Sequence, residues 1–310
     1  MKKILYIFMA IAVAAGAVSC KEQYVTYDDA EYLIFSDTLS TNAVLVNGKP
    51  FKVPVSSTVT RKYDRTYAVE IVDKGSNAIE GLHYRLKSNT FTIPAGEVSA
   101  DIEVYGNYEN IEPTDSLGFT LQLVMPDELK WNLYPKHNQT KVVMFKACPF
   151  DVNEWGGSIE EPRYCKLTSL LLYSYPGQNT SYSRLVKCYK HKNKENTVIM
   201  DDLFYDGYDV ELTFKTDNPS EPLLVMEAGQ VLGDEFSVLG IEWGDGKLLG
   251  QTSPAGSYTS AYNACQKYAQ LYVRVYVNDF STLIGYIGDF YNVLEWISEE
   301  EAKEIMREGL

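Results

Sequence analysis

Hydrophobic and polar residues alternate with a period of two along several stretches after residue 30. In "FKVPVSS", Phe51, Val53 and Val55 fall on one face, and Lys52, Pro54 and Ser56 fall on the other. The same alternation recurs in three later runs, residues 67–73, 100–106 and 119–125. Gly, Pro and Asn residues separate these runs, a pattern typical of antiparallel strands with one buried face. Two such sheets packed face to face predict a β-sandwich.

The alternation continues in the second half of the chain, from about residue 150 to residue 297. "YDVELTF" places Val210, Leu212 and Phe214 on one face, and "QLYVRVYVN" (270–278) repeats the pattern with Leu and Val. We predict a second antiparallel domain, either a sandwich or an open barrel. The segment 244–264 is rich in Gly, Ser, Thr and Pro, which predicts a loop.

A short helix is expected at the end of the chain, over residues 298–310. Ser298 and Glu301 form a capping box, and acidic residues crowd the first turn, where the helix dipole favours them. Ala302, Ile305 and Met306 make a narrow apolar stripe, which would either dock on the second domain or fray.

The first 20 residues have the pattern of an export signal. Lys2 and Lys3 precede an apolar run of only 15 residues, Ile4–Val18, which is shorter than the ~20 residues that span a bilayer. The ending "AVSC" resembles a bacterial lipobox, in which Cys20 becomes the lipidated N-terminus. We therefore expect a signal peptide over 1–19, lipidation at Cys20 and an anchor linker over 20–29.

The residues after Cys20 bear on location. "KEQ" resembles in part the acidic surface-export signal of Bacteroidota lipoproteins, but it carries one acid where that signal has two or more. This resemblance implies a lipid anchor in the outer membrane, with the cell surface as the further expectation. Without residues 1–19 the chain has 26 basic and 42 acidic residues, a formal charge of −16. Such a balance disfavours nucleic acid as a partner.

The cysteines other than Cys20 all lie in the second half of the chain. Cys148, Cys165, Cys188 and Cys265 could form two disulfides in an oxidising compartment, with three possible connectivities. They could equally be small buried hydrophobic residues in a domain that needs no cross-links. No C-x-x-C spacing suggests zinc.

The stretch "EGLHYRLKSNTFTIPAGEVSADIEV", followed by "IEPTDSLGFTLQL", resembles the Calx-beta-like family of immunoglobulin-like sandwiches. The positions that fit its motifs are Gly81, Tyr84, Ile93, Pro94, Ala95, Gly96, Glu97, Phe119, Leu121 and Leu123. The resemblance covers about residues 30–147 and implies an immunoglobulin-like first domain. Pro94 pre-sets a turn and Gly96 permits positive φ.

Some members of that family bind calcium through an acidic loop. The corresponding residues here are Glu109, Glu112 and Asp115. Calcium takes six to eight oxygen ligands, and this loop carries Asn107, Tyr108 and Asn110 where the family has consecutive acids. We expect solvated turn acids rather than a metal site, and no cofactor.

A lipobox, a Calx-beta-like domain (30–147), a β-rich domain (148–297) and a C-terminal helix or tail (298–310) together resemble an uncharacterised family of Bacteroidota outer-membrane lipoproteins. Relatives in that group are often associated with glycan-import systems. The resemblance implies a cellular location and a domain organisation more than a biochemical activity.

Candidate catalytic residues are sparse. The three histidines lie far apart in sequence, and the chain lacks a nucleophile elbow, a P-loop and an H-E-x-x-H motif. Glu242 and Asp245 in "EWGDG" could imitate the carboxylate pair of a glycosidase, but acids around a Gly turn are typical of hairpins. We expect a protein that is not an enzyme.

Two groups of aromatic residues are candidates for ligand binding. The outward face of the 268–276 strand carries Tyr268, Tyr272, Arg274 and Tyr276, which could stack on sugar rings or on a partner protein. The alternative is that another layer covers this face. The loop "DELKWNLYPKHN" offers Trp131 and Tyr134 between two strands.

Two short motifs, "DTL" and "DSL", match the O-glycosylation pattern known in Bacteroidota, with Thr38 and Ser116 as acceptors. Such short patterns also arise by chance.

These observations favour a lipid-anchored outer-membrane protein that binds or scaffolds. Its partner would be a glycan, captured within an import system, or another outer-membrane protein. The alternative function is an adhesin or a structural component of a surface assembly, and a hydrolase is the third possibility.

Overall fold

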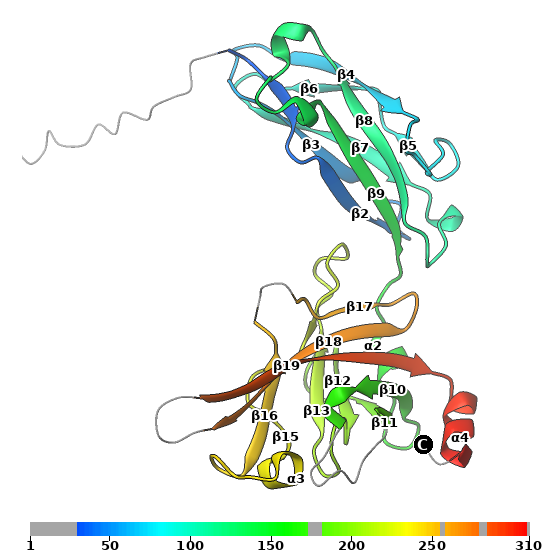
Figure 1. The fold of residues 1–310 in the computed structure, drawn as a ribbon. Helices are drawn as coiled ribbons and strands as arrows, with labels where there is room; N and C mark the ends of the chain where they lie inside the picture. Colours follow the sequence, from blue (N-terminus) through cyan, green and yellow to red (C-terminus); the bar gives the residue numbers. More distant parts are fainter. Residues whose placement is uncertain (1–29, 173–181, 255–257, 279–283, 309–310) are drawn as a thin grey trace, which may run out of the picture.

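The structure is a computed structural model that describes residues 30–172, 182–254, 258–278 and 284–308. The expected signal peptide (1–19), the lipidation site Cys20 and the anchor linker (20–29) lie outside this part of the chain. The described residues form two β-bodies, one after the other along the chain (Figure 1).

The first body is a sandwich of two sheets. One sheet has the order β1 (Leu33–Phe35), β3 (Phe51–Ser57), β7 (Ser99–Gly106) and β5 (Tyr84–Leu86). The other has the order β2 (Leu39–Leu45), β9 (Gln139–Ala147), β8 (Leu117–Val124), β4 (Arg65–Val72) and β6 (Thr90–Ile93). Strands β2 and β9 pair in parallel, and the other pairs are antiparallel. Short 3₁₀ helices η1 (Tyr108–Asn110), η2 (Asp127–Leu129) and η3 (Pro135–Asn138) lie in its loops.

The core of this sandwich is formed by the inward side chains that alternation predicted. Val53, Val55, Phe119, Leu121 and Leu123 are all buried between the two sheets. Burying one face of each strand removes apolar surface from water. This burial stabilises the packing of the two sheets by roughly 25 cal/mol for each Å² of apolar surface buried. The predicted immunoglobulin-like sandwich is confirmed.

The turn with the most specific sequence motif has the expected geometry. Gly96 has a φ of +85°, and the N–H of Glu97 donates to the carbonyl of Pro94 at 3.1 Å. A residue with a Cβ would be strained at this φ, which explains the glycine.

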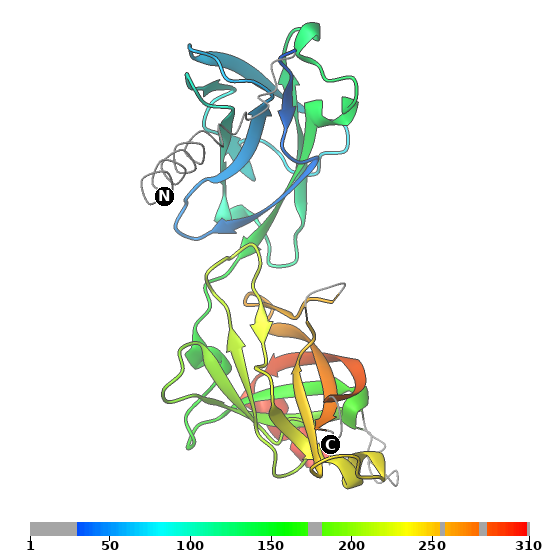
Figure 2. The same ribbon diagram turned by 90° about the vertical axis from the view of Figure 1, so that its left-hand side faces the viewer.

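The second body is one antiparallel sheet that curls on itself. Its order is β14 (Leu224–Val225), β13 (Val210–Phe214), β12 (Thr197–Asp201), β11 (Ser183–Lys190), β10 (Arg163–Ser169), β19 (Ile284–Ile297), β18 (Tyr268–Asn278), β16 (Lys247–Thr252) and β15 (Gln230–Asp234), and β17 (Ala261–Asn263) pairs with β18. The amide of Gln230 on β15 exchanges hydrogen bonds of 2.6 and 2.8 Å with the backbone of Glu211 on β13. This contact brings distant strands of the sheet together and makes it an open barrel, one of the two predicted architectures (Figure 2).

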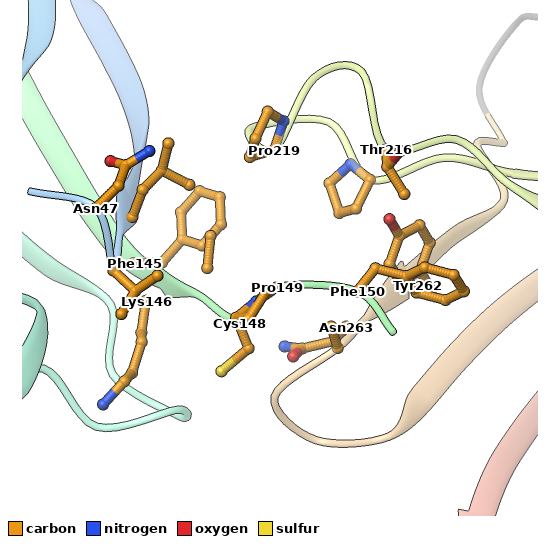
Figure 3. Close-up of a pocket in the computed structure, with 15 residues that line it drawn as sticks. Asn47, Phe145, Lys146, Cys148, Pro149, Phe150, Thr216, Pro219, Tyr262 and Asn263 are labelled. Carbon is orange, nitrogen blue, oxygen red and sulfur yellow. The ribbon is translucent and has the colours of Figure 1, made fainter. Parts of the chain in front are cut away.

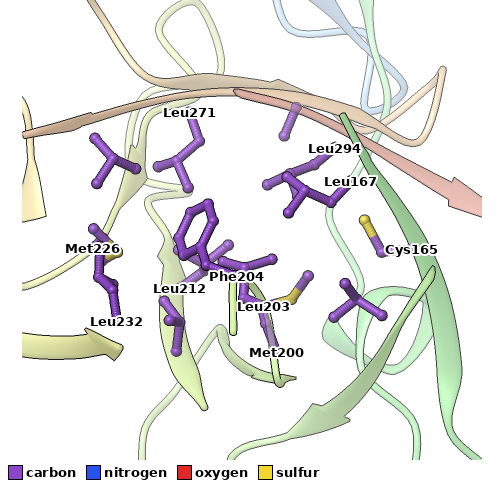
Figure 4. Close-up of a cluster of buried hydrophobic side chains, with 14 of the residues drawn as sticks. Cys165, Leu167, Met200, Leu203, Phe204, Leu212, Met226, Leu232, Leu271 and Leu294 are labelled. Carbon is purple, nitrogen blue, oxygen red and sulfur yellow. The ribbon is translucent and has the colours of Figure 1, made fainter. Parts of the chain in front are cut away.

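The interior of the barrel is apolar. Figure 4 shows Leu271 and Leu294 pointing from the β18–β19 side toward Leu203, Phe204 and Leu212. Helix α2 (Val152–Trp155), helix α3 (Glu235–Leu239) and the 3₁₀ helix η4 (Leu170–Leu172) lie at its margins.

The prediction of a loop over 244–264 is wrong for part of that segment, because β16 and β17 lie within it. The glycine that favoured a loop has a packing role. A Cβ on Gly250 would lie 2.6 Å from Cδ1 of Leu232, so glycine is what lets β16 approach this buried leucine. Composition alone did not separate a packing glycine from a turn glycine.

The four downstream cysteines divide into two kinds. Cys148 and Cys265 form a disulfide with their Cα atoms 5.1 Å apart, and Cys165 and Cys188 are buried free thiols. The interpretation of all four as buried thiols is therefore wrong for one pair. The disulfide links the segment after β9 to the turn between β17 and β18, far away in sequence.

Helix α4 (Glu299–Glu308) follows β19 at the end of the barrel and confirms the predicted C-terminal helix. The N–H of Glu301 donates to Oγ of Ser298 at 3.2 Å, as half of a capping box would. Ala302 is fully buried against the barrel, whereas Met306 is 47% exposed, so only part of the apolar stripe docks. No helix in the described ranges is both long and apolar enough to cross a bilayer.

Candidate ligand-binding site

Strands β18 and β19 carry a row of tyrosines on the outside of the barrel. Leu271, Val273 and Val275 of β18 point into the core, so the even-numbered residues between them point outward. Tyr272 pairs with Tyr291 of β19, Arg274 with Asp289 and Tyr276 with Tyr286. We call the outward tyrosines of this region the tyrosine face; its members are Tyr258, Tyr268, Tyr272, Tyr286 and Tyr291.

The rings at the centre of the tyrosine face contact one another. The ring centroids of Tyr258 and Tyr272 are 5.2 Å apart, and those of Tyr272 and Tyr291 are 4.9 Å apart. The hydroxyls of Tyr268 and Tyr291 are hydrogen-bonded at 3.2 Å. That bond, together with burial, raises the pKa of Tyr291 to about 12, so the hydroxyl stays protonated at neutral pH. The rings nevertheless face solvent, since Tyr258 is 54% exposed and Tyr291 is 44% exposed.

A charged pair lies beside these rings. Nε and Nη2 of Arg274 donate to the two carboxylate oxygens of Asp289, each at 3.0 Å. Ser253 Oγ and the hydroxyl of Tyr286 also donate to Asp289, at 2.7 and 3.2 Å. The hydrogen bonds from Arg274 lower the pKa of Asp289, and the bond to Asp289 raises the pKa of Arg274. The guanidinium also lies 5.1 Å from the ring centroid of Tyr286.

An open cavity of about 470 Å³ adjoins this pair. Gln251, Arg274, Tyr276 and Tyr286 line it. Gln251 reaches the cavity because β16 pairs with β18 and places it opposite Arg274. The cavity therefore combines two aromatic walls with an amide, which can donate to and accept from hydroxyls, and a guanidinium, which can only donate.

Tyr276 was predicted as an accessible ligand contact, but it is only 7% exposed. Its hydroxyl accepts a hydrogen bond of 2.9 Å from the N–H of Gly229. Tyr276 therefore serves as a wall of the cavity, held in place by the neighbouring loop. The other outward residues of the strand, Tyr268, Tyr272 and Arg274, are partly exposed.

Several residues of this site were missed in the sequence, namely Tyr258, Tyr286, Asp289 and Tyr291. The run "IGYIGDFYNVLEWI" alternates, but its register shifts opposite Val275 and Tyr276, where β19 has one extra residue. This β-bulge breaks the period of two, so alternation in the sequence did not identify which residues of β19 face outward.

The loop with Trp131 and Tyr134 does not join the tyrosine face. It lies at the end of the first body that is away from the barrel (Figure 1). Trp131 stacks on Tyr32 with centroids 5.2 Å apart and an interplanar angle of 3°, and Tyr134 meets it edge-on at 4.7 Å. Trp131 is therefore partly covered, while Tyr134 is 49% exposed.

A second cavity, of about 310 Å³, lies where the two bodies meet (Figure 3). Its apolar lining includes Phe145, Phe150, Pro219 and Tyr262. Beside it, the Cys148–Cys265 disulfide ties the residue that follows β9 to the barrel, and a hydrogen bond of 3.3 Å from the N–H of Ala43 to Ser220 Oγ connects the two bodies. Phe150 and Tyr262 are also packed on each other, 5.4 Å between centroids, as part of a buried aromatic cluster. We interpret this cavity as part of the joint between the bodies.

The calcium candidates do not gather around a common point. Asp115 accepts a hydrogen bond from the N–H of Glu112 at 3.0 Å, and Glu109 is exposed on η1. Within the described residues, the group of side chains spaced to hold a metal ion is instead Asp201, Asp202 and Asp209. Its carboxylates accept bonds from nearby backbone N–H groups, as turn acids do.

Four further candidate residues are exposed or lie in turns. Thr38 and Ser116, the O-glycosylation candidates, are both solvent-exposed. Glu242 and Asp245 are exposed as well, and Asp245 accepts the N–H of Lys247 at 3.2 Å, as a hairpin residue would.

Comparison with known proteins gives one family match. Residues 134–308 match the model of a family described as a domain of unknown function, DUF4984. This match confirms the expectation of an uncharacterised family. No curated protein matches the chain.

Several solved structures resemble the chain. A Bacteroides ovatus protein of unknown function is 11% identical, with 85% of this chain and 89% of that one covered and a TM-score of 0.33. The apo form of the Calx CBD1 domain is 16% identical, with 38% and 98% covered and a TM-score of 0.31. An auxiliary nutrient binding protein from Bacteroides thetaiotaomicron is 13% identical, with 84% and 91% covered and a TM-score of 0.29. With TM-scores this low, these similarities carry no argument about function.

Proposed function

The chain belongs to the DUF4984 family, and we propose that it is a lipid-anchored, non-enzymatic protein that binds neutral glycans at its tyrosine face. The observation that carries this proposal is the arrangement of the site. Exposed tyrosine rings in mutual contact lie beside an open cavity, and the Arg274–Asp289 pair fixes the polar groups at its edge.

The chemistry of this surface suits a sugar. A pyranose ring has an apolar C–H face that packs on an aromatic ring, and hydroxyls at its rim that need hydrogen-bond partners. Tyr272 and Tyr291 supply the rings, and Gln251 and Arg274 supply donors and acceptors. Because these side chains already contact one another, little conformational entropy is lost when a ligand binds.

The electrostatics favour an uncharged ligand. Arg274 is neutralised by Asp289 through two hydrogen bonds, so its charge is not available to an anion. The chain has a formal charge of −14, which repels polyanions. A neutral polysaccharide or its fragments is therefore the ligand class that we propose.

The proposed location follows from the N-terminal sequence. The apolar run and the "AVSC" ending support cleavage before Cys20 and lipidation there, and thioether- and amide-linked chains together would give a stable anchor. We place the protein at the outer membrane with its barrel available to glycans at the cell surface, where an outer-membrane import protein would be its partner.

The alternative is a protein–protein contact, as in an adhesin or a surface assembly. Tyrosine is enriched at such interfaces, and the exposed rings of Tyr286 and Tyr291 would serve there too. A hydrolase is less well supported, because the described lining of the cavity contains no carboxylate.

The proposal is tested by screening the protein on an array of neutral and acidic glycans and titrating the best ligand. We expect saturable binding of a neutral glycan, and a loss of about tenfold or more in affinity, ~1.4 kcal/mol, in Tyr272→Ala and in Tyr291→Ala. Tyr182→Ala is the matched control, since Tyr182 is 54% exposed in the same body but outside the tyrosine face.

Equal glycan affinity in Tyr272→Ala, Tyr291→Ala and Tyr182→Ala would contradict the proposal that the glycan binds at the tyrosine face. Binding of no glycan, together with capture of a partner protein that Tyr291→Ala abolishes, would favour the alternative. Conversion of the glycan into shorter fragments by the wild-type protein would favour a hydrolase.

A further inference from the structure

Four segments meet at the end of the first body where the described chain begins: residues 30–32, 58–65, 94–97 and 126–138. The N–H of Tyr32 donates to Oγ1 of Thr58 at 2.9 Å, and Tyr32 stacks on Trp131. The N–H of Ala95 donates to Oδ1 of Asp64 at 2.8 Å. We call the surface formed by these segments the entry end.

The entry end presents large apolar side chains to solvent. Leu133 is 78% exposed, Tyr63 is 62% exposed and Tyr134 is 49% exposed. Single exposed apolar residues are common, but three such residues in the connected loops at one end of the body suggest contact with something apolar.

The loop that carries Leu133 is held in a defined conformation. The N–H of Tyr134 donates to the carbonyl of Trp131, and the N–H of His137 donates to the carbonyl of Tyr134, each at 3.0 Å. His137 Nδ1 lies 3.1 Å from the carbonyl oxygen of Phe35 on β1. Because rings and backbone bonds fix both sides of Leu133, its exposure is a property of the fold rather than of a frayed loop.

The charge of the entry end differs from that of the rest of the chain. It contains five basic and five acidic side chains, which are Arg61, Lys62, Arg65, Lys130 and Lys136, and Glu31, Asp64, Glu97, Asp127 and Glu128. Its formal charge is thus zero, whereas the chain carries −14. An anionic lipid surface therefore does not repel the entry end, whereas it repels the negatively charged remainder of the molecule.

The position of the chain start points to the same partner. Cys20 precedes Ala30 by ten residues, which span at most about 35 Å when fully extended. A lipid on Cys20 would keep the entry end within that distance of the bilayer, while the barrel lies beyond the opposite end of the first body (Figures 1 and 2).

We infer that the entry end rests on the membrane surface, with Leu133 at the boundary of the hydrocarbon and the rings of Tyr63, Trp131 and Tyr134 among the headgroups. Tyrosine and tryptophan favour this interface because one part of each ring system is apolar and another is polar. The inference rests on the proposed lipid anchor at Cys20, because one leucine and a few rings give only weak membrane binding by themselves. Its consequence is that the protein stands upright and holds the tyrosine face away from the bilayer.

Trp131 provides a built-in reporter of this contact. The full chain has four tryptophans, of which Trp155 and Trp296 are buried and Trp243 is 59% exposed. Trp243→Phe removes the other exposed ring. The full-length chain with this substitution is produced in a bacterial host that processes lipoproteins, purified from membranes and reconstituted in phosphatidylethanolamine–phosphatidylglycerol vesicles with and without brominated acyl chains. Mass spectrometry of the N-terminal peptide shows separately whether Cys20 carries lipid.

We expect brominated lipid to quench Trp131, and Leu133→Asp to reduce that quenching about twofold or more. The Trp131→Phe variant gives the baseline of the two buried tryptophans. Leu170→Asp is the matched control, since Leu170 is 67% exposed on the barrel, and it should change nothing.

Two results would overturn the inference while leaving glycan binding intact. Lipidated protein in which quenching equals the Trp131→Phe baseline would show that the entry end does not reach the bilayer. A dimer that Leu133→Asp dissociates, again without quenching, would show that a second copy covers this surface. Cys20 without lipid would instead overturn the proposed anchor, and the inference with it.

Discussion

Arg274 and Asp289 set the electrostatic character of the proposed binding site. The two side chains are joined by two hydrogen bonds of 3.0 Å, and both remain partly accessible to solvent. Hydrogen bonds from Arg274 lower the pKa of Asp289 below its ordinary value of 3.8, and the bond to Asp289 raises the pKa of Arg274 above its ordinary value. The pair is therefore ionised throughout the physiological pH range.

A pH dependence follows from these directions. Folding depresses the pKa of Asp289, so the stability that its ionised carboxylate gives to the folded state is fully present above the ordinary pKa of 3.8. That stability is lost as the pH falls through the lower pKa that Asp289 has in the folded protein. We expect glycan affinity to be constant between about pH 8 and about pH 5, and to fall only in more acidic solution. Titrations across this range check the prediction. A midpoint between about pH 6 and pH 7 would instead implicate a histidine, and none is among the described residues that line this site.

The outward orientation of a single residue could be predicted where its environment is local, whereas its role in ligand binding stays a prediction. Tyr272 and Arg274 were identified from alternation within one strand, and their partial exposure agrees with an outward position. Tyr276 has the same periodicity, yet it is buried, because the loop around Gly229 packs over it. That loop is distant in sequence, so periodicity carried no information about it.

At the scale of secondary-structure elements, the strands with the plainest alternation were predicted correctly. In β3, β8 and β18 the apolar set faces a core, because a slip of one residue would expose every one of these side chains. β16 was missed because it lies in the segment 244–264, whose Gly, Ser, Thr and Pro content predicted a loop, whereas the structure uses Gly250 for close packing against Leu232. The outward residues of β19 were missed because of its bulge.

The disulfide connects two segments that are far apart in sequence. It joins Cys148, directly after β9, to Cys265 between β17 and β18, across 117 residues of sequence. Cross-linking distant positions reduces the conformational freedom of the unfolded chain. This effect typically stabilises the folded state by about 2–4 kcal/mol. The sequence could not reveal this pair, because four cysteines allow three pairings and also allow none.

We expect the Cys148→Ser, Cys265→Ser double variant to lose about 2–4 kcal/mol in the free energy of unfolding of the second body. Urea denaturation followed by the emission of the buried Trp155 and Trp296 measures it. Reductant should lower the stability of the wild-type protein to that of the double variant and leave the variant itself unchanged. Equal stability of the wild-type protein and the variant without reductant would contradict the proposed role of the bond.

At the scale of the whole molecule, the entry end and the tyrosine face lie on different bodies. The entry end lies where the described chain begins, and the tyrosine face belongs to the barrel, which lies beyond the opposite end of the first body (Figure 1). Trp131 and the tyrosines of β18 were predicted as alternative ligand sites, and the structure separates them. The proposed membrane contact and the proposed glycan site therefore lie on separate surfaces.

The overall architecture of two β-bodies with a terminal helix was predictable, because each body depends on strand periodicity. The proposed binding site was predictable only in part. Half of it comes from β19, from Gln251 on β16 and from Tyr258, which reach β18 through the curl of the sheet. Such convergence depends on strand order, and no pattern within one segment of sequence encodes it.

Hydroxyl-radical footprinting of the wild-type protein, with and without its glycan, tests the central claim most directly, because it reports the solvent exposure of individual side chains. The account predicts that the glycan protects Tyr258, Tyr286 and Tyr291 from oxidation, while Tyr182 and the cavity residues Phe145 and Pro219 at the joint react as before. Protection of the joint, with Tyr286 and Tyr291 still fully reactive, would contradict it.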